Sequence, residues 1–235
     1  LVNPCVFYLK EKELRIVVHG DDFTVAGCEE YLNWFRQEIA KRMDVKFRAR
    51  LGPDEKDDKA VRILNRVVQW TEQGIEYEAD QRHSEIIMRE AKLSSDSKSV
   101  KTPGMKIQEE SGEGYSDSGY RSIAARCNYL AQDRPDIQFA TKEVCKNMAN
   151  PEVRHWPSVK RISRYLKGSS RLVLRFDRQS IPKKIVVWTD SDYAGCSESR
   201  KSTSGGVVML GNHCVKSWST KQDVIAFKGI SHALG

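Results

Sequence analysis

Short apolar runs alternate with polar turns at the start of the chain. Residues 5–9 and 14–18 are mostly apolar, with β-branched and aromatic side chains, and a charged turn at 10–13 separates them. This pattern predicts a β-hairpin. A third run of the same kind, 23–27, follows a polar tip at 19–22, so we expect three short antiparallel strands whose second turn carries adjacent carboxylates.

Four later segments have apolar residues at helical spacing. The segment 29–43 repeats an apolar residue every three or four positions, which predicts an amphipathic helix, and 81–93 shows a similar pattern. Residues 120–148 predict two helices broken at Arg134-Pro135-Asp136, because proline disfavours helix at the residue before it. A proline near its start and a glycine at its end delimit a further helix over 157–168.

The remaining segments indicate strands and one linker. Residues 45–79 are typical of short strands joined by loops. Residues 94–119 are rich in Ser, Gly, Lys and Glu with few large apolar side chains, which is typical of a linker. The runs at 185–188, 206–210 and 214–218 predict a three-stranded meander. Strands in separate groups with helices between them predict an α+β fold.

Composition excludes some classes of protein. The 235 residues (26.8 kDa) have a mean hydropathy of −0.58, and no apolar run approaches the roughly 18 residues of a membrane-spanning helix, so we expect no membrane partner. The six cysteines form no C-x-x-C pair. This usage predicts reduced thiols in a cytosolic or nuclear protein.

Positive charge is concentrated in one segment. Lys and Arg number 39 against 32 Asp and Glu, a net charge of +7, and residues 154–184 hold ten of these cations and one acid, Asp177. A stripe of this density is typical of a protein that binds a polyanion. A solvated basic face is the equally simple alternative. On the helix at 157–168, the apolar positions leave Lys160, Arg161, Arg164 and Lys167 toward solvent.

Two groups of carboxylates are candidates for metal chemistry. Asp21 and Asp22 lie at the hairpin tip, where two adjacent carboxylates can hold divalent cations for phosphoryl transfer. A plain type I′ turn, which favours Gly and Asp, is the structural alternative. Asp190 ends an apolar strand, where it can hold a metal at a sheet edge or simply cap the strand. The chain has no P-loop, no G-x-G-x-x-G and no recognisable Ser/His/Asp or Cys/His arrangement.

Several segments, in order, resemble the polyproteins of copia-type retrotransposons. The tip 18–23 is similar to the aromatic-x-Asp-Asp box of reverse transcriptases, with His19 in the aromatic position. Further segments resemble the block that follows the polymerase palm and then the start of the RNase H domain. They are Tyr120-Arg121, Asn128-Tyr129-Leu130, Arg134-Pro135-Asp136-Ile137, Pro151, His155-Trp156, residues 160–168 (KRISRYLKG), 189–196 (TDSDYAGC), 200–206 (RKSTSGG) and 217–222 (SWSTKQ).

The resemblance implies a fold and a division of the chain into four segments. It implies the C-terminal end of a reverse-transcriptase palm with the following subdomain over 1–93, and a linker over 94–119. A helical connection with a basic face over 120–181 would follow, and then the first three strands of an RNase H-like fold over 182–235. The implied function is that of a fragment of a retrotransposon RNA-directed DNA polymerase with associated RNase H.

The same resemblance implies roles for single residues. Asp21, Asp22 and Asp190 would be catalytic ligands of Mg²⁺ (or Mn²⁺) in phosphoryl transfer. Lys160, Arg161, Arg164 and Lys167 would contact the sugar-phosphate backbone. The implied partners are an RNA template, a DNA primer, an RNA–DNA hybrid and the rest of the Pol polyprotein, in a cytoplasmic virus-like particle or in the nucleus.

The chain departs from the family pattern at both catalytic centres. In that pattern a third polymerase carboxylate precedes Leu1, and a Glu-bearing RNase H helix stands where residues 227–235 run here without any Glu. We therefore expect this chain alone to be inactive. The alternative function is a catalytically dead remnant that only binds nucleic acid.

Overall fold

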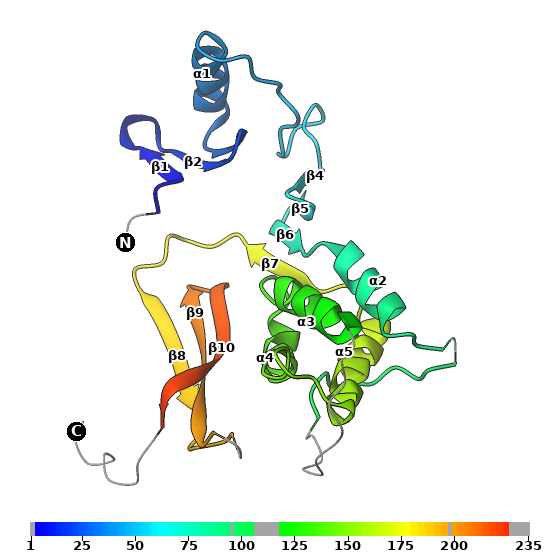
Figure 1. Cartoon of the computed structure of the whole chain (residues 1–235). Coiled ribbons are helices and arrows are strands. Elements are labelled where there is room, and N and C mark those ends of the chain that lie inside the picture. Colours follow the sequence, from blue (N-terminus) through cyan, green and yellow to red (C-terminus); the bar gives the residue numbers. More distant parts are fainter. Residues whose placement is uncertain (1–2, 95, 106–117, 197–198, 226–235) are drawn as a thin grey trace, which may run out of the picture. The chain divides into compact units, whose positions relative to one another are not determined.

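The structure, a computed structural model, describes residues 3–94, 96–105, 118–196 and 199–225 (Figure 1). It is α+β, and its three sheets are antiparallel. The chain divides into two compact units, Leu1–Ala49 and Arg50–Gly235. No helix among the described residues is long and apolar enough to cross a membrane.

The first unit is a three-stranded sheet followed by one helix. The sheet has the order β1-β2-β3, and the helix α1 follows the third strand. The predicted strands are confirmed, and the predicted helix ends three residues early, at Ala40. Leu14 is the one fully buried apolar residue among those described in this unit. The elements are β1 (Val6–Leu9), η1 (Lys10–Lys12), β2 (Leu14–His19), β3 (Asp22–Ala26) and α1 (Glu29–Ala40).

The second unit begins with a four-stranded sheet that brings together distant regions of the sequence. Its order is β4-β5-β6-β7, from β4 (Ala60–Ile63), β5 (Arg66–Trp70), β6 (Gly74–Glu78) and β7 (Val173–Asp177). The strands at 45–79 were predicted. The strand β7 was not predicted, because its apolar alternation is short and its partner β6 lies about a hundred residues earlier.

Helices form the main hydrophobic core of the second unit. Tyr120, Ile123, Ile137, Val159 and Ile162 are all fully buried in it, and they come from three different elements. The predicted helices and the predicted break are confirmed. The elements are α2 (Gln81–Glu90), α3 (Ser118–Leu130), η2 (Pro135–Ile137), α4 (Gln138–Cys145), η3 (Val153–His155) and α5 (Trp156–Gly168).

A buried ion pair holds the break between α3 and α4 against the end of α5. The guanidinium of Arg134, 1% exposed, donates to both carboxylate oxygens of Asp136 at 2.9 and 2.7 Å. It also donates to the carbonyl oxygens of Ser169 and Ser170 at 2.9 and 3.2 Å. Tyr165 of α5 donates its hydroxyl to Asp136 at 2.9 Å. The proline-containing break is therefore a structural joint as well as a helix stop.

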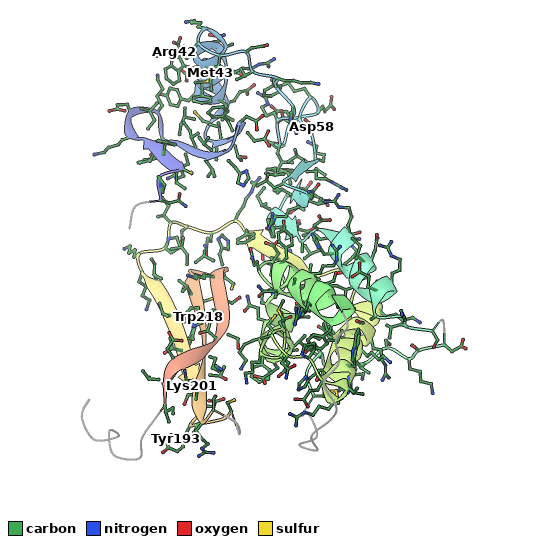
Figure 2. The ribbon with its side chains drawn as sticks, in the orientation of Figure 1. Arg42, Met43, Asp58, Tyr193, Lys201 and Trp218 are labelled. Carbon is green, nitrogen blue, oxygen red and sulfur yellow. The ribbon has the colours of Figure 1, made fainter. Side chains whose placement is uncertain are left out.

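The last sheet is the predicted meander, with longer strands than expected. Its order is β10-β9-β8, from β8 (Ile185–Ser191), β9 (Lys201–Leu210) and β10 (His213–Ile225). Trp218 lies opposite Gly206, where a Cβ would stand 2.1 Å from the indole, so glycine makes room for the ring (Figure 2). Trp188 of β8 is 68% exposed, so this sheet carries uncovered apolar side chains.

Several expectations lie beyond what the structure tests. The α+β arrangement agrees with the sequence, but the assignments to a reverse-transcriptase palm and an RNase H-like fold stay predictions. The division into four segments also stays a prediction; the boundary between the compact units falls at Ala49, inside the predicted segment 1–93. Residues 106–117 of the predicted linker and the segment 226–235 lie outside the described residues.

Candidate nucleic-acid interface

The helix α5 separates apolar and basic side chains onto two faces. Val159, Ile162 and Leu166 are completely buried in the core, as their helical spacing predicted. Lys160 and Lys167 are exposed. Thus packing of the apolar face fixes the side on which the cations of this helix stand.

A short segment, residues 96–105, crosses this basic face, and we call it the strap. It belongs to the predicted linker. Because of its contacts with α5, the expectation that all four cations face solvent is wrong for Arg161 and Arg164. Arg161 and Arg164 are half-buried, because their guanidinium groups donate to neutral oxygens of the strap. The bonds are Arg161 to the Thr102 carbonyl (3.1 Å) and hydroxyl (2.8 Å), Arg164 to the Lys98 carbonyl (2.6 Å) and Lys167 to the Ser97 carbonyl (3.1 Å).

Carboxylates pair with three of the six cations that the basic segment 154–184 carries outside α5. The cations of the unpredicted strand β7 and its flanks face acids of β6, and the cation before α5 faces an acid of its own loop. These pairs are Arg171–Glu78 (2.7 Å), Arg175–Glu76 (3.8 Å) and Arg154–Glu152 (2.8 Å). Among the described residues, by contrast, neither Arg161 nor Arg164 has a carboxylate at salt-bridge distance. These two guanidinium groups therefore keep a positive charge that an anion can contact.

The hairpin tip places Asp21 and Asp22 at the start of β3. Asp22 pairs with His19 across the turn, so Gly20 and Asp21 are the two turn residues. The φ of Gly20 is +61°, whereas Asp21 is not among the residues of positive φ. A type I′ turn needs positive φ at both positions, so the turn is of another type. Asp21 is exposed, and Asp22 forms an ion pair with Arg48 at 3.4 Å.

Asp190 and its neighbour Asp192 behave differently. Asp190 is exposed near the end of β8, and its carboxylate accepts the backbone N–H of Ser191 at 2.9 Å. Asp192, to which the sequence assigned no role, accepts the backbone N–H of Thr203 at 2.6 Å and that of Gly195 at 3.4 Å. These bonds lower the pKa of the Asp192 carboxyl. Asp192 therefore caps the turn between β8 and β9. Strand capping was the structural alternative that the sequence analysis gave for Asp190.

The carboxylates only partly fit the metal that the resemblance implies. Mg²⁺ takes six oxygen ligands, usually one or two carboxylates together with waters and substrate phosphates. Asp21 and Asp22 supply two carboxylates, but the guanidinium of Arg48 competes for one of them. Among the described residues no group of three or more His, Cys, Asp and Glu is placed to hold a metal. The set is incomplete as it stands, and we derive no catalytic step through a metal.

Comparison with known proteins shows which proteins the chain is similar to in sequence. The chain is 37% identical over 105 residues to the uncharacterized mitochondrial protein AtMg00810 of Arabidopsis thaliana. It is 35% identical over 121 residues to the retrovirus-related Pol polyprotein from transposon RE1 of the same plant. Its similarity to the retrovirus-related Pol polyprotein from transposon TNT 1-94 of Nicotiana tabacum extends over 93% of the chain, at 27% identity. The chain is a homologue of retrovirus-related Pol polyproteins from copia-type transposons.

The match covers only a fraction of each of these relatives. The chain spans 43% of AtMg00810, 8% of the RE1 polyprotein and 17% of the TNT 1-94 polyprotein. A comparison with protein-family models finds no match, and no solved structure matches the chain. The homology therefore rests on sequence similarity alone, which extends over 93% of the chain for the TNT 1-94 polyprotein.

Proposed function

We propose that the chain is a segment of a retrotransposon RNA-directed DNA polymerase with its associated RNase H. The observation that carries this proposal is the similarity to the TNT 1-94 Pol polyprotein along 93% of the chain. The order of the motifs supports the same assignment, since the Asp-Asp tip precedes the basic helix and the strand of Asp190. Its natural context is then the rest of a Pol polyprotein, in a virus-like particle or in the nucleus.

In this proposal the carboxylates and the basic helix have separate tasks. Asp21 and Asp22 contribute ligands for Mg²⁺ or Mn²⁺ at the polymerase centre, and Asp190 does so at the RNase H centre; the ion would polarise phosphate oxygens. The helix α5 binds the sugar-phosphate backbone of an RNA template, a DNA primer or their hybrid. This contact is independent of base sequence and weakens with salt.

A second function, nucleic-acid binding without catalysis, is favoured by a specific observation. The ion pair between Asp22 and Arg48 already occupies one carboxylate of the tip. By contrast, Arg161 and Arg164 of α5 bond to neutral oxygens of the strap and keep their charge for a polyanion. A remnant of this kind would hold nucleic acid and turn over nothing.

One experiment separates the two functions. Primer extension on an RNA template, and cleavage of RNA in an RNA–DNA hybrid, are measured with Mg²⁺ for a complete Pol polyprotein that contains this chain, and for three variants of that polyprotein. We expect D21N/D22N to abolish extension and D190N to abolish cleavage. The matched control D44N, which changes an exposed Asp of the first unit, should leave both activities intact.

Each outcome has a clear meaning. Activity that survives D21N/D22N or D190N contradicts the corresponding catalytic role. Salt-sensitive binding of the same nucleic acids by the unaltered polyprotein, with no turnover at any Mg²⁺ or Mn²⁺ concentration, supports the second function instead.

A further inference from the structure

A basic groove runs between α5, the strap and the segment after α2. Its volume is about 490 Å³, and its lining consists of four cations, two serines and three apolar residues. The cations are Lys92, Lys160, Arg161 and Arg164, and the serines are Ser94 and Ser97. None of the lining residues in the described regions of the chain is acidic. An anion in this groove would meet four positive charges and two hydroxyl groups.

The two arginines of the groove are held in place but retain free donors. A guanidinium group has five N–H donors in a rigid fork. Arg161 uses two bonds to Thr102, and Arg164 uses one bond to Lys98. The strap therefore fixes both planes while further N–H groups remain for a second acceptor. Fixing them in advance lowers the entropic cost of binding.

The two lysines supply charge that nothing in the described structure neutralises. Lys92 follows the end of α2, and Lys160 lies in the first half of α5. No hydrogen bond or ion pair of either ammonium group occurs among the described residues. Because both residues belong to the lining, their charge lies beside an anion bound in the groove.

We propose that this groove is a phosphate-binding site and that its ligand is a phosphodiester of a nucleic-acid strand. The inference rests on the proposed function and makes it more specific, since it places the contact in a groove that includes Lys92 and excludes the basic residues of β7. Phosphate matches this chemistry, because Arg donates to two phosphate oxygens at once and Lys adds a point charge. The groove has no aromatic side chain on which a base could stack, so binding is independent of sequence.

The test compares two variants that remove the same charge from different places. K92Q/K160Q removes the two unpaired cations of the groove. The matched control K183Q/K184Q removes two exposed lysines of the same basic segment, outside the groove. Binding of a short fluorescein-labelled oligothymidylate to the full chain is measured by fluorescence polarisation between about 50 and 200 mM salt. Circular dichroism melts check that all three proteins are folded.

We expect K92Q/K160Q to weaken binding at least ~10-fold, the effect of losing one charge-assisted hydrogen bond. It should also reduce the slope of log K against log salt by about 1.4, since each lost contact to a single strand accounts for about 0.7. The control should change the slope far less. Equal effects of the two variants, or none from K92Q/K160Q, overturn the proposal while leaving nucleic-acid binding in place.

Two further results separate this inference from the proposed function and from another phosphate source. Absence of oligothymidylate binding by the unaltered chain at low salt contradicts both the groove and the proposed function. A ³¹P line width of inorganic phosphate that depends on Lys92 and Lys160, with unaltered oligothymidylate binding, shows a site for a free anion and overturns the assignment to a nucleic-acid strand.

Discussion

Replacing Arg134 by Met tests whether the break between α3 and α4 is held by its buried ion pair. Met is similar in length and apolar, so the substitution removes the charge without opening a large cavity. In the structure Arg134 makes four hydrogen bonds, two to Asp136 and one each to the carbonyls of Ser169 and Ser170. All four are lost in the variant.

The structure sets the expected magnitude. Removing one partner of a buried ion pair costs about 3 to 5 kcal/mol, because the other charge stays buried without compensation. The Asp136 side chain is 19% exposed and keeps its bond from Tyr165, and Ser169 and Ser170 are half-buried and exposed residues, respectively. Because Asp136 keeps one hydrogen bond and some contact with solvent, we expect R134M to lower the free energy of unfolding by about 3 kcal/mol, the low end of this range.

Urea denaturation of the full chain, followed by far-ultraviolet circular dichroism, measures this loss in the helices. The control R126M makes the same chemical change on α3, where the arginine is 35% exposed and pairs with Glu90 at 3.5 Å. We expect the control to lower the free energy of unfolding by less than about 1 kcal/mol. A loss for R134M no larger than that of R126M refutes the reasoning, because the ion pair would then contribute no more than a surface contact.

Three more predictions concern the second unit. G74A should lower the free energy of unfolding by about 2 kcal/mol or more, because the new Cβ would stand 2.1 Å from a backbone oxygen of β7. Amide hydrogens between β6 and β7 should then exchange faster. The control G104A, whose Cβ meets nothing within 4 Å, should leave stability unchanged. The hydrogen bonds from Arg171 hold the pKa of Glu78 below 4.5, so stability should fall as pH drops below that value, and E78Q should flatten this dependence in acid titrations. Burial lowers the pKa of His83 below 6.5, so the unfolded chain binds more protons than the folded chain in acid. Stability should therefore decrease as the pH falls below 6.5. A pKa of His83 at or above 6.5 in an NMR titration contradicts this.

Features that depend on neighbouring residues could be predicted from the sequence. The turn at Gly20 follows from a residue that can take a positive φ, and the break at Pro135 and the start of α5 follow from prolines, which restrict their own backbone and that of the preceding residue. The buried face of α5 follows from a spacing of three and four residues within one helix. For these features the sequence contains the physical cause within a few positions.

Features that depend on distant pairing could not be predicted in this way. The strand β7 forms only because β6 offers an open edge, and this edge lies about a hundred residues earlier in the chain. The capping role of Asp192 depends on the backbone of Thr203 on the next strand. The strap binds α5 mostly through its carbonyl groups, which every residue has, so apart from the hydroxyl of Thr102 its side chains carry no signal of that contact.

Contacts between distant residues also decide how many cations of the basic segment can bind a nucleic acid. If all ten cations of residues 154–184 contacted a single strand, the slope of log K against log salt would be about −7. Acids already face Arg154, Arg171 and Arg175, and ion pairs of that kind release no counterions from a nucleic acid. The four cations of the groove alone predict a slope of about −3. The salt dependence of the unaltered chain therefore distinguishes binding by one groove from binding by the whole basic segment.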